Sequence, residues 1–325
     1  MHAQLLGWET LVLEQNEVIG GKAGGIEVEG YQLDPGPSIV IMTDIYQSVF
    51  QAAGRRMEDF LRFTRLSPFS RIWLEGQNQP LDLPDGRAAC LKELQKAVPE
   101  DYDGLLRLLS KLDQAADPIK RTILSKPLHH PWQLADPRLI SAASKFNLKL
   151  SYKELVESFF SSRLLRAFFY GFPSYSGQSY HSKAAGALMI PYYMIEGGVW
   201  WPEGGAASIP RAFAQLGKEL GVQFRTGAKV SSLQVEQGRV SGVFLESGEL
   251  IPCDALISNR DRLSFEKDLG RGEPSRPSSS YFTCHWGVRR NLPHLSHHTL
   301  LVPDDFAVGF EELYSQNLPP ASPVI

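Results

Sequence analysis

The spacing of hydrophobic and polar residues predicts a chain that mixes strands with helices. A short apolar run at 11–13 ends in the acidic Glu14, as a buried parallel strand does at its carboxyl end. Further strands are predicted at 222–225, 229–235, 239–246, 254–258 and 278–288. Two apolar runs that flank polar residues, 71–76 and 79–83, predict a hairpin.

Helical periodicity occupies much of the remaining chain. Helices are predicted at 45–63 and 208–220, the second ending at Gly221, and a helical region at 88–170 is expected to break at Pro118 and later prolines. The clearest helix, at 155–169, places large apolar residues on one side: Leu155, Val156, Phe159, Phe160, Leu164, Leu165, Phe168 and Phe169. Such a stripe is typical of a core, and the wall of a ligand site is the alternative.

Composition narrows the class of protein. With 43% apolar residues over 325 positions the chain is long enough for a large core and for two domains. No apolar stretch reaches the ~18 residues of a spanning helix. Three dispersed cysteines argue against disulfides and zinc and favour a reducing compartment, and a net charge of -3 gives no sign of nucleic-acid binding.

Glu14 and two glycine-rich turns are the candidate ligand-binding features of the sequence. An acid at the end of a parallel strand is placed to bind ribose hydroxyls of a dinucleotide. Gly20, Gly21 and Gly24 allow backbone amides to approach a phosphate, with the charge of Lys22 beside them. A second tight turn follows at 34–38. Either turn alone is equally typical of a loop between strands, but in this order they predict a cofactor site.

The predicted dinucleotide unit is incomplete. Before the first strand, Leu5, Leu6 and Gly7 are typical of the last turn of a helix. A complete unit begins with another strand and a G-x-G-x-x-G turn, and none precedes Glu14. We therefore expect an α/β fold in which a Rossmann-like domain lacks its first strand.

Four stretches carry a resemblance to the flavin-dependent amine oxidase superfamily, and within it to the phytoene desaturase and carotenoid desaturase-isomerase family. They are 12–24, 31–37, 198–205 and 221–259, in the order that the family has them. The pair His297-His298 also matches. Relatives usually carry arginine where this chain has Lys22, which keeps the charge but loses the planar fork. Because the family motifs at both ends are missing, the chain resembles a fragment truncated on both sides.

The resemblance implies FAD as the cofactor of an interrupted domain at 1–70 and 196–265, interleaved with an α+β substrate domain at 71–195 and 266–325. The implied cofactor-binding residues are Glu14, Gly20, Gly21, Lys22, Ala23, Gly36, Pro37, Lys229, Val230 and Asn259. The implied substrate-lining residues are Phe168, Phe169, Tyr170, Trp200 and His298. No residue is assigned to catalysis and none to a metal, since adjacent histidines on an extended chain point to opposite sides.

The implied activity is desaturation of a long isoprenoid hydrocarbon by hydride transfer to flavin. Alternatives are a carotenoid isomerase, a retinol saturase-like enzyme, an inactive fragment, or a flavin-free isoprenoid carrier like the Rab escort and GDP-dissociation inhibitor proteins. The retained Glu14 and glycine turn argue against the carrier. Because such a hydrocarbon resides in the bilayer, we expect a cytoplasmic protein bound peripherally to a membrane.

Overall fold

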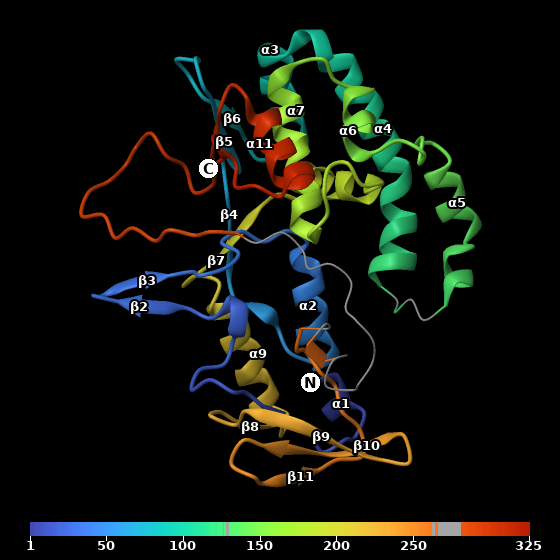
Figure 1. Cartoon of the computed structure of the whole chain (residues 1–325), viewed down its shortest axis with the longest axis vertical. Helices are drawn as coiled ribbons and strands as arrows, with labels where there is room; N and C mark the ends of the chain where they lie inside the picture. The colour runs from blue at the N-terminus through green and yellow to red at the C-terminus, as the bar shows by residue number, and fades with distance from the viewer. Residues whose placement is uncertain (126, 128–129, 262–263, 266–280) are drawn as a thin grey trace. The chain divides into compact units, whose positions relative to one another are not determined.

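The computed structural model describes residues 1–125, 127, 130–261, 264–265 and 281–325. The chain divides into two compact units, each built from two separate stretches of sequence (Figure 1). Unit 1 comprises Met1–Thr64 and Trp201–Gly287, and unit 2 comprises Arg65–Trp200 and Val288–Ile325. The chain passes between the units at β4 (Phe63–Arg65) and β7 (Trp200–Pro202), which pair as a two-stranded sheet.

Unit 1 contains the parallel strand pair that the sequence predicts. Strand β1 (Leu11–Leu13) pairs with β8 (Gln223–Arg225), and the Glu14 amide extends the pairing by donating to the Arg225 carbonyl at 2.9 Å. Helix α9 (Ser208–Glu219) leads into β8 through Gly221, whose φ of +90° favours glycine. Both strands, the helix and its stop are confirmed. Glu14 thus follows directly on the paired end of β1.

Two antiparallel sheets complete the strands of unit 1. One contains β9 (Val230–Glu236), β10 (Arg239–Leu245) and the unpredicted β11 (Leu250–Pro252), in the order β11-β10-β9. The predicted turn between β9 and β10 is confirmed, since Gln237 and Gly238 have φ of +50° and +78°, as a two-residue hairpin turn requires. The other sheet is the hairpin of β2 (Ile26–Val28) and β3 (Tyr31–Leu33).

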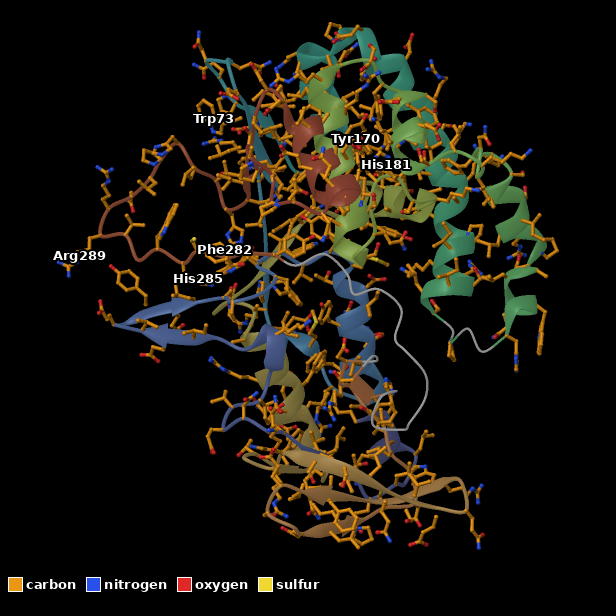
Figure 2. The ribbon with its side chains drawn as sticks, viewed as in Figure 1. Trp73, Tyr170, His181, Phe282, His285 and Arg289 are labelled. Carbon is orange, nitrogen blue, oxygen red and sulfur yellow. The ribbon has the colours of Figure 1, made fainter. Side chains whose placement is uncertain are left out.

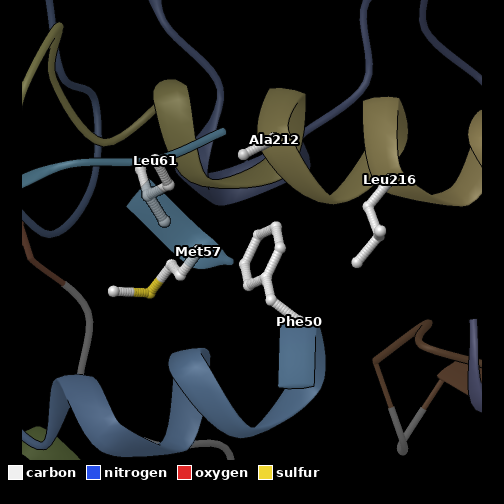
Figure 3. Close-up of a cluster of buried hydrophobic side chains, with 5 residues drawn as sticks. All are labelled: Phe50, Met57, Leu61, Ala212 and Leu216. Carbon is white, nitrogen blue, oxygen red and sulfur yellow. The ribbon is translucent and has the colours of Figure 1, made fainter. Parts of the chain in front are cut away.

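The apolar faces of two helices form the core of unit 1. Helix α2 (Thr43–Ala52) packs against α9, while α1 (His2–Leu5) is a single short turn. Figure 3 shows the buried side chains of this core: Phe50, Met57, Leu61, Ala212 and Leu216. The Phe50 ring also stacks on Phe213, with 5.6 Å between centroids. Burial of these side chains fixes α9, and with it the start of β8.

Unit 2 is built on a three-stranded sheet of order β12-β5-β6. Strand β5 (Ser70–Leu74) pairs antiparallel with β6 (Leu81–Leu83), which confirms the predicted hairpin, and parallel with the distant β12 (Thr299–Val302). The Arg71 guanidinium binds both carboxylate oxygens of Asp82 across the hairpin, at 2.6 and 2.7 Å.

Helices supply most of the remaining mass of unit 2. They are α3 (Arg87–Ala97), α4 (Tyr102–Ile119), α5 (Pro137–Ala143), α6 (Tyr152–Glu157), α7 (Arg163–Tyr170), α8 (Met189–Gly197) and α11 (Phe306–Glu311). The Arg87 guanidinium ties three of them together, since it pairs with Asp113 of α4 and Glu196 of α8 at 2.8 Å each.

The long helix predicted at 155–169 is wrong, because the chain forms two short helices there. Helix α6 ends at Glu157 and α7 begins at Arg163. Between them, the buried carboxylate of Asp101 accepts hydrogen bonds from the amides of Ser161 and Ser162 at 2.6–2.9 Å. The Ser162 hydroxyl then caps α7 by accepting from the Leu165 amide. These polar contacts at Ser161 and Ser162 therefore interrupt the helix, although the apolar periodicity of the sequence continues through them.

Two further helix predictions need correction. The helix predicted at 45–63 ends at Ala52, because Gly54 with φ of +67° closes it and the Arg55 amide returns to the Phe50 carbonyl. Pro118 does not break α4, which continues past it into a wider π turn at Lys120–Leu124.

Two predicted strands are absent from the described residues. The ladder of β10 ends where the Cys253 amide donates to the Ser241 carbonyl, and 254–258 then runs without a described strand beside it, leaving Ile257 87% exposed. Of the strand predicted at 278–288, residues 278–280 lie outside the described residues. The part at 281–288 makes no sheet pairing there and exposes Phe282, because its imperfect alternation offers no face to bury.

Candidate cofactor site

Glu14 is half-buried at the point where β1 meets the loop after β8. Its Oε1 accepts hydrogen bonds from the Asn16 amide at 2.8 Å and from Asn16 Nδ2 at 2.9 Å. Among the described residues no hydrogen bond is directed at Oε2. The backbone carbonyl of Glu14 accepts a hydrogen bond from the Ala228 amide at 2.8 Å, and the Gly227 amide donates a hydrogen bond to the backbone carbonyl of Asn16. The carboxylate is therefore held in place and keeps one oxygen for a ligand hydroxyl.

The first glycine turn follows as a single 3₁₀ turn at Gly21–Ala23. Gly20 and Gly21 adopt φ of +137° and +53°, a conformation that L side chains rarely take. In the described part of the chain, the amides of Gly21 and Lys22 donate to no protein acceptor. Lys22 is exposed beside them. This turn therefore presents backbone donors and one positive charge, as a phosphate site requires.

The structure brings the two glycine turns into direct contact. A Cβ on Gly36 would lie 2.2 Å from the carbonyl oxygen of Lys22, far inside any tolerable contact. A Cβ on Gly20 would lie 3.1 Å from Pro210 at the start of α9. Both positions therefore require glycine for packing, and Gly36 and Pro37 lie against the turn that carries Lys22.

Asp34 is a positioning residue that the sequence did not single out. Its Oδ1 accepts a hydrogen bond from the Ala206 amide at 2.9 Å, across 172 positions of sequence. The neighbouring Gly205 has φ of +80°, and a Cβ there would lie 2.8 Å from the same oxygen. The only sequence signal is the pair Gly204-Gly205 just before α9. This contact fixes the second glycine turn to the helix that leads into β8.

Of the three remaining predicted cofactor residues, two lie next to Glu14 on the sheet side of the site. Lys229 and Val230 follow directly on Ala228, which is bound to Glu14, and the Lys229 carbonyl accepts from the Glu246 amide at 2.9 Å. Asn259 is exposed, and the described residues give it no hydrogen bond to Glu14 or to either turn. The structure thus brings Lys229 and Val230 to the site, and among the described residues no hydrogen bond ties Asn259 to it.

These groups form a donor and acceptor set suited to a dinucleotide. A carboxylate at the end of a parallel strand accepts hydroxyl protons, and turn amides beside a lysine bind a phosphate. The described residues hold no group of three or more His, Cys, Asp or Glu placed to bind a metal ion. The donors and acceptors present are of the kinds that nucleotide binding uses.

The predicted substrate residues of α7 are buried within unit 2. Phe168, Phe169 and Tyr170 are 2–7% exposed. Phe168 packs edge-on against Phe169 at 5.4 Å, and Tyr170 lies 5.9 Å from Phe306 of α11, measured between ring centroids. Figure 2 shows Tyr170 in this aromatic group of unit 2. In this structure the three side chains therefore serve as core.

Trp200 and His298 are half-buried in unit 2. The Trp200 indole donates to the Gly197 carbonyl at 3.1 Å, and the Arg65 guanidinium lies 5.2 Å from its ring centroid. His298 precedes β12, where its Nδ1 is buried and has no partner among the described residues. Burial and the neighbouring His297 lower the pKa of His298, so its imidazole is neutral near pH 7.

Two surface pockets of unit 2 lie on its sheet. One, of about 400 Å³, is lined by residues of β5 and β12, and the other, of about 660 Å³, by residues of β5 and β6. Neither is lined by Phe168, Phe169, Tyr170, Trp200 or His298. The predicted substrate residues therefore do not share either pocket.

Comparison with a protein-family model gives a match over residues 4–260, to the flavin containing amine oxidoreductases. The matched range includes every predicted cofactor-binding residue. It agrees with the predicted flavin cofactor and oxidoreductase class.

Curated relatives match almost the whole chain. A zeta-carotene-forming phytoene desaturase of Myxococcus xanthus is 28% identical over 96% of this chain and 62% of its own length. A 4,4'-diapolycopene oxygenase of Methylomonas is 28% identical over 96% and 64%. A 4,4'-diaponeurosporene oxygenase of Staphylococcus aureus is 26% identical over 98% and 66%. The chain thus spans somewhat less than two thirds of the length of these relatives.

Solved structures share the fold. An oxidoreductase from Methanosarcina mazei aligns with a TM-score of 0.55 at 15% identity, covering 82% of this chain and 57% of that one. A protein from Pyrococcus furiosus aligns with a TM-score of 0.53 at 16% identity over the same shares. At these identities the likeness establishes the fold, which is the predicted α/β arrangement with an interleaved second domain.

Proposed function

Because the chain belongs to the flavin-containing amine oxidoreductases, we propose that unit 1 holds FAD through the site described above. Glu14 accepts hydrogen bonds from the ribose hydroxyls through its available carboxylate oxygen. The amides of Gly20, Gly21 and Lys22, with the charge of the Lys22 side chain, bind the pyrophosphate, and the Ala23 amide closes the turn by donating to the Gly20 carbonyl. The contact of the two glycine turns supports these roles, because it closes the backbone around the place where phosphate would lie.

Four more residues complete the proposed cofactor site. Gly36 and Pro37 shape the wall opposite the first turn, since no side chain fits at Gly36. The main chain of Lys229 and Val230 contacts the adenine, supported by the bond between Ala228 and Glu14. Asn259 reaches the cofactor only if the exposed segment at 254–259 closes over unit 1.

We propose a long isoprenoid hydrocarbon as the substrate and desaturation as the reaction. The observation that carries this is the similarity over nearly the whole chain to a protein named a phytoene desaturase. FAD supplies the hydride acceptor when bound. The protein's part is to orient the hydrocarbon and exclude water, which needs few polar side chains.

The aromatic residues of unit 2 are the proposed substrate contacts. Phe168, Phe169 and Tyr170 reach a hydrocarbon only if their cluster opens, because all three are buried. Trp200 and His298 are half-buried and contact the substrate without such a rearrangement. The neutral His298 imidazole adds no charge to an apolar surface.

Oxygenation of the same hydrocarbon class is a second candidate. Two of the relatives are named as a 4,4'-diapolycopene oxygenase and a 4,4'-diaponeurosporene oxygenase, at 26–28% identity. Desaturation removes two hydrogens and oxygenation adds oxygen, so the mass of the product separates them. The residues proposed to hold FAD are the same in both cases.

We propose that the protein works at a membrane surface, because a long hydrocarbon substrate partitions into lipid. Within the described residues, no helix has the length and apolar character needed to cross a bilayer. Peripheral association is the mode we propose, because the substrate partitions into lipid.

The test is turnover of phytoene in lipid vesicles by the protein supplied with FAD and a quinone. We expect products with longer conjugated chromophores and a mass lower by two hydrogens per step. Glu14→Gln is expected to lose this activity at limiting FAD and to regain part of it at excess FAD. Conversion that is unaffected by omitting FAD would contradict the proposal, and products that gain oxygen would favour the second candidate.

A further inference from the structure

The segment at 119–149 of unit 2 exposes an unusual set of large apolar side chains. Six of them are between 39% and 67% exposed: Ile123, Leu124, Trp132, Leu134, Ile140 and Leu148. They are not needed for the core of the neighbouring helix, because α4 buries a separate face containing Leu105, Leu108 and Leu112. The segment therefore offers apolar surface to something outside the fold.

The elements that carry these side chains are packed together. The π turn at Lys120–Leu124 continues α4 and contacts the 3₁₀ turn at Pro131–Leu134, and α5 packs along α4. Figure 1 shows α4 and α5 side by side. The Trp132 ring stacks on His130 with 3.9 Å between centroids, which holds the indole at the surface. Five of the exposed residues, all but Leu148, thus come from elements of unit 2 that are linked by these contacts.

The charge of the segment is opposite to that of the chain. The described residues between 119 and 149 contain five Lys or Arg and one Asp, whereas the whole chain has a net charge of -3. Arg121 pairs with Asp117 at 2.7 Å, while Arg138 and Lys149 are exposed. Apolar side chains, a tryptophan and a local excess of cations are the composition that binds an anionic lipid interface.

Another exposed apolar region of the chain lacks this charge. Trp8 is 52% exposed, but residues 1–29 contain five Glu and one Lys. An anionic surface would repel this region, so exposure of a tryptophan alone does not predict lipid binding. Exposed apolar side chains occur together with an excess of cations at 119–149, and this combination indicates an anionic lipid partner.

We propose that residues 119–149 dock unit 2 onto an anionic lipid bilayer. Trp132, Ile140 and the neighbouring apolar side chains enter the interface, while Arg138 and Lys149 meet the head groups. The inference rests on the proposed function in one respect, since a membrane surface is where a hydrocarbon substrate is collected. Each cation near such a surface strengthens binding by about fivefold.

The test is sedimentation of the whole chain with vesicles of phosphatidylcholine alone or with phosphatidylglycerol added. We expect binding to the anionic vesicles only. Arg138→Glu with Lys149→Glu should weaken it by at least about tenfold. The matched control, Lys92→Glu with Lys183→Glu, reverses two exposed lysines elsewhere in unit 2 and should bind like the parent.

The apolar part of the surface is tested separately. Trp132→Ser is expected to weaken vesicle binding by about tenfold, and the control Trp8→Ser to leave it unchanged. In the milder variant Trp132→Phe, which conserves the apolar surface, binding persists while quenching of the protein's fluorescence by brominated lipid falls. The fall in quenching shows that Trp132 lies in the lipid, whether or not Trp132→Ser folds.

Several results would overturn the proposal. They are equal binding to neutral and anionic vesicles, no binding to either, or parental binding by the reversed-charge variant. Soluble polyglutamate that displaces the protein as well as anionic vesicles do would indicate an acidic protein partner instead. None of these readings uses flavin or turnover, so failure of lipid docking is distinguishable from failure of the proposed function.

Discussion

At the scale of single residues, the cofactor site depends on positions where backbone meets backbone or carboxylate. Gly36 lies against the Lys22 carbonyl, and Gly205 lies against the Asp34 carboxylate with φ of +80°. Neither place has room for a Cβ. The two turns are therefore held by close approach of the main chain, which is the feature that a phosphate site needs.

Gly36→Ala is expected to weaken FAD binding by at least about tenfold, because the new methyl group pushes the Lys22 turn away from its place. The measurement is titration of flavin fluorescence with purified protein. The control is Gly186→Ala, where an added Cβ meets nothing within 4 Å. Equal affinities for the two variants would show that the contact between the turns does not shape the site.

Asp101 is a second residue whose substitution is expected to have a large effect, in this case on stability rather than on binding. Burial raises the pKa of its carboxyl, but hydrogen bonds from Ser161 and Ser162 outweigh this and leave the pKa below its usual value. Asp101→Ala is expected to lower the free energy of unfolding by about 2–3 kcal/mol, because two buried amides lose a charged acceptor. Urea unfolding at pH 7 measures this.

Asp103→Ala, on the exposed side of α4, is the comparison for that variant. A loss of stability no greater than that of Asp103→Ala would mean that the amides of Ser161 and Ser162 find other partners.

Residue-scale features differ in how far the sequence predicts them. Glu14 and the glycines of the first turn are predictable, because strand, acid and turn follow one another within a few positions. The role of Asp34 is not, since its partner Ala206 is 172 positions away and nothing local marks the pair. Asp101 is hidden for the same reason, its partners lying 60 positions further on.

At the scale of elements, caps and stops decide where periodic segments end. The apolar stripe at 155–169 continues through 158–162, yet the chain breaks there because a distant carboxylate binds the amides of the turn. The strands β1, β8, β9 and β10 match short apolar segments of the sequence, and each pairs with a neighbouring strand. At 254–258 the pattern alone misleads, since a strand also needs a neighbour to accept its hydrogen bonds.

The carboxylate of Glu311, at the end of α11, gathers several hydrogen-bond donors of unit 2. Tyr180 donates to it at 2.6 Å, His181 Nε2 lies 3.0 Å away and Ser315 donates at 2.8 Å. Figure 2 shows His181 in the part of unit 2 that surrounds Tyr170. The Tyr180 hydrogen bond, with those of Ser315 and His181, lowers the pKa of Glu311 to about 2.

Glu311→Gln is expected to lower the urea midpoint at neutral pH, because it removes the charge that these donors bind. Since the folded-state pKa is lowered, the stabilising contribution is fully present above the usual value of about 4.5 and is lost as the pH falls toward 2. The difference between parent and variant should therefore shrink over that window.

Urea titrations at pH 7, 5, 4 and 3 measure the difference. Glu93→Gln, which removes an exposed carboxylate paired with Lys96, is the matched control. A difference between parent and Glu311→Gln that stays constant down to pH 3 would contradict the role given to this carboxylate.

At the scale of the whole molecule, the chain interleaves two units, so each unit is completed by a distant stretch of sequence. The pairing of β1 with β8 and of β5 with β12 joins segments about 200 positions apart or more. Sequence alone indicates this arrangement only through the order of the family motifs. It does not predict which exposed apolar surfaces carry charge around them, because that depends on which residues the fold leaves outside.

The measurement that tests the central claim most directly is the flavin content of this chain after incubation with FAD and desalting. If the described residues of unit 1 form the site, the absorption spectrum of bound flavin persists in the parent and in Glu9→Gln. In Glu14→Gln it falls sharply. A colourless parent protein, or equal flavin retention in the two variants, would contradict the assignment of the site to Glu14 and the glycine turns.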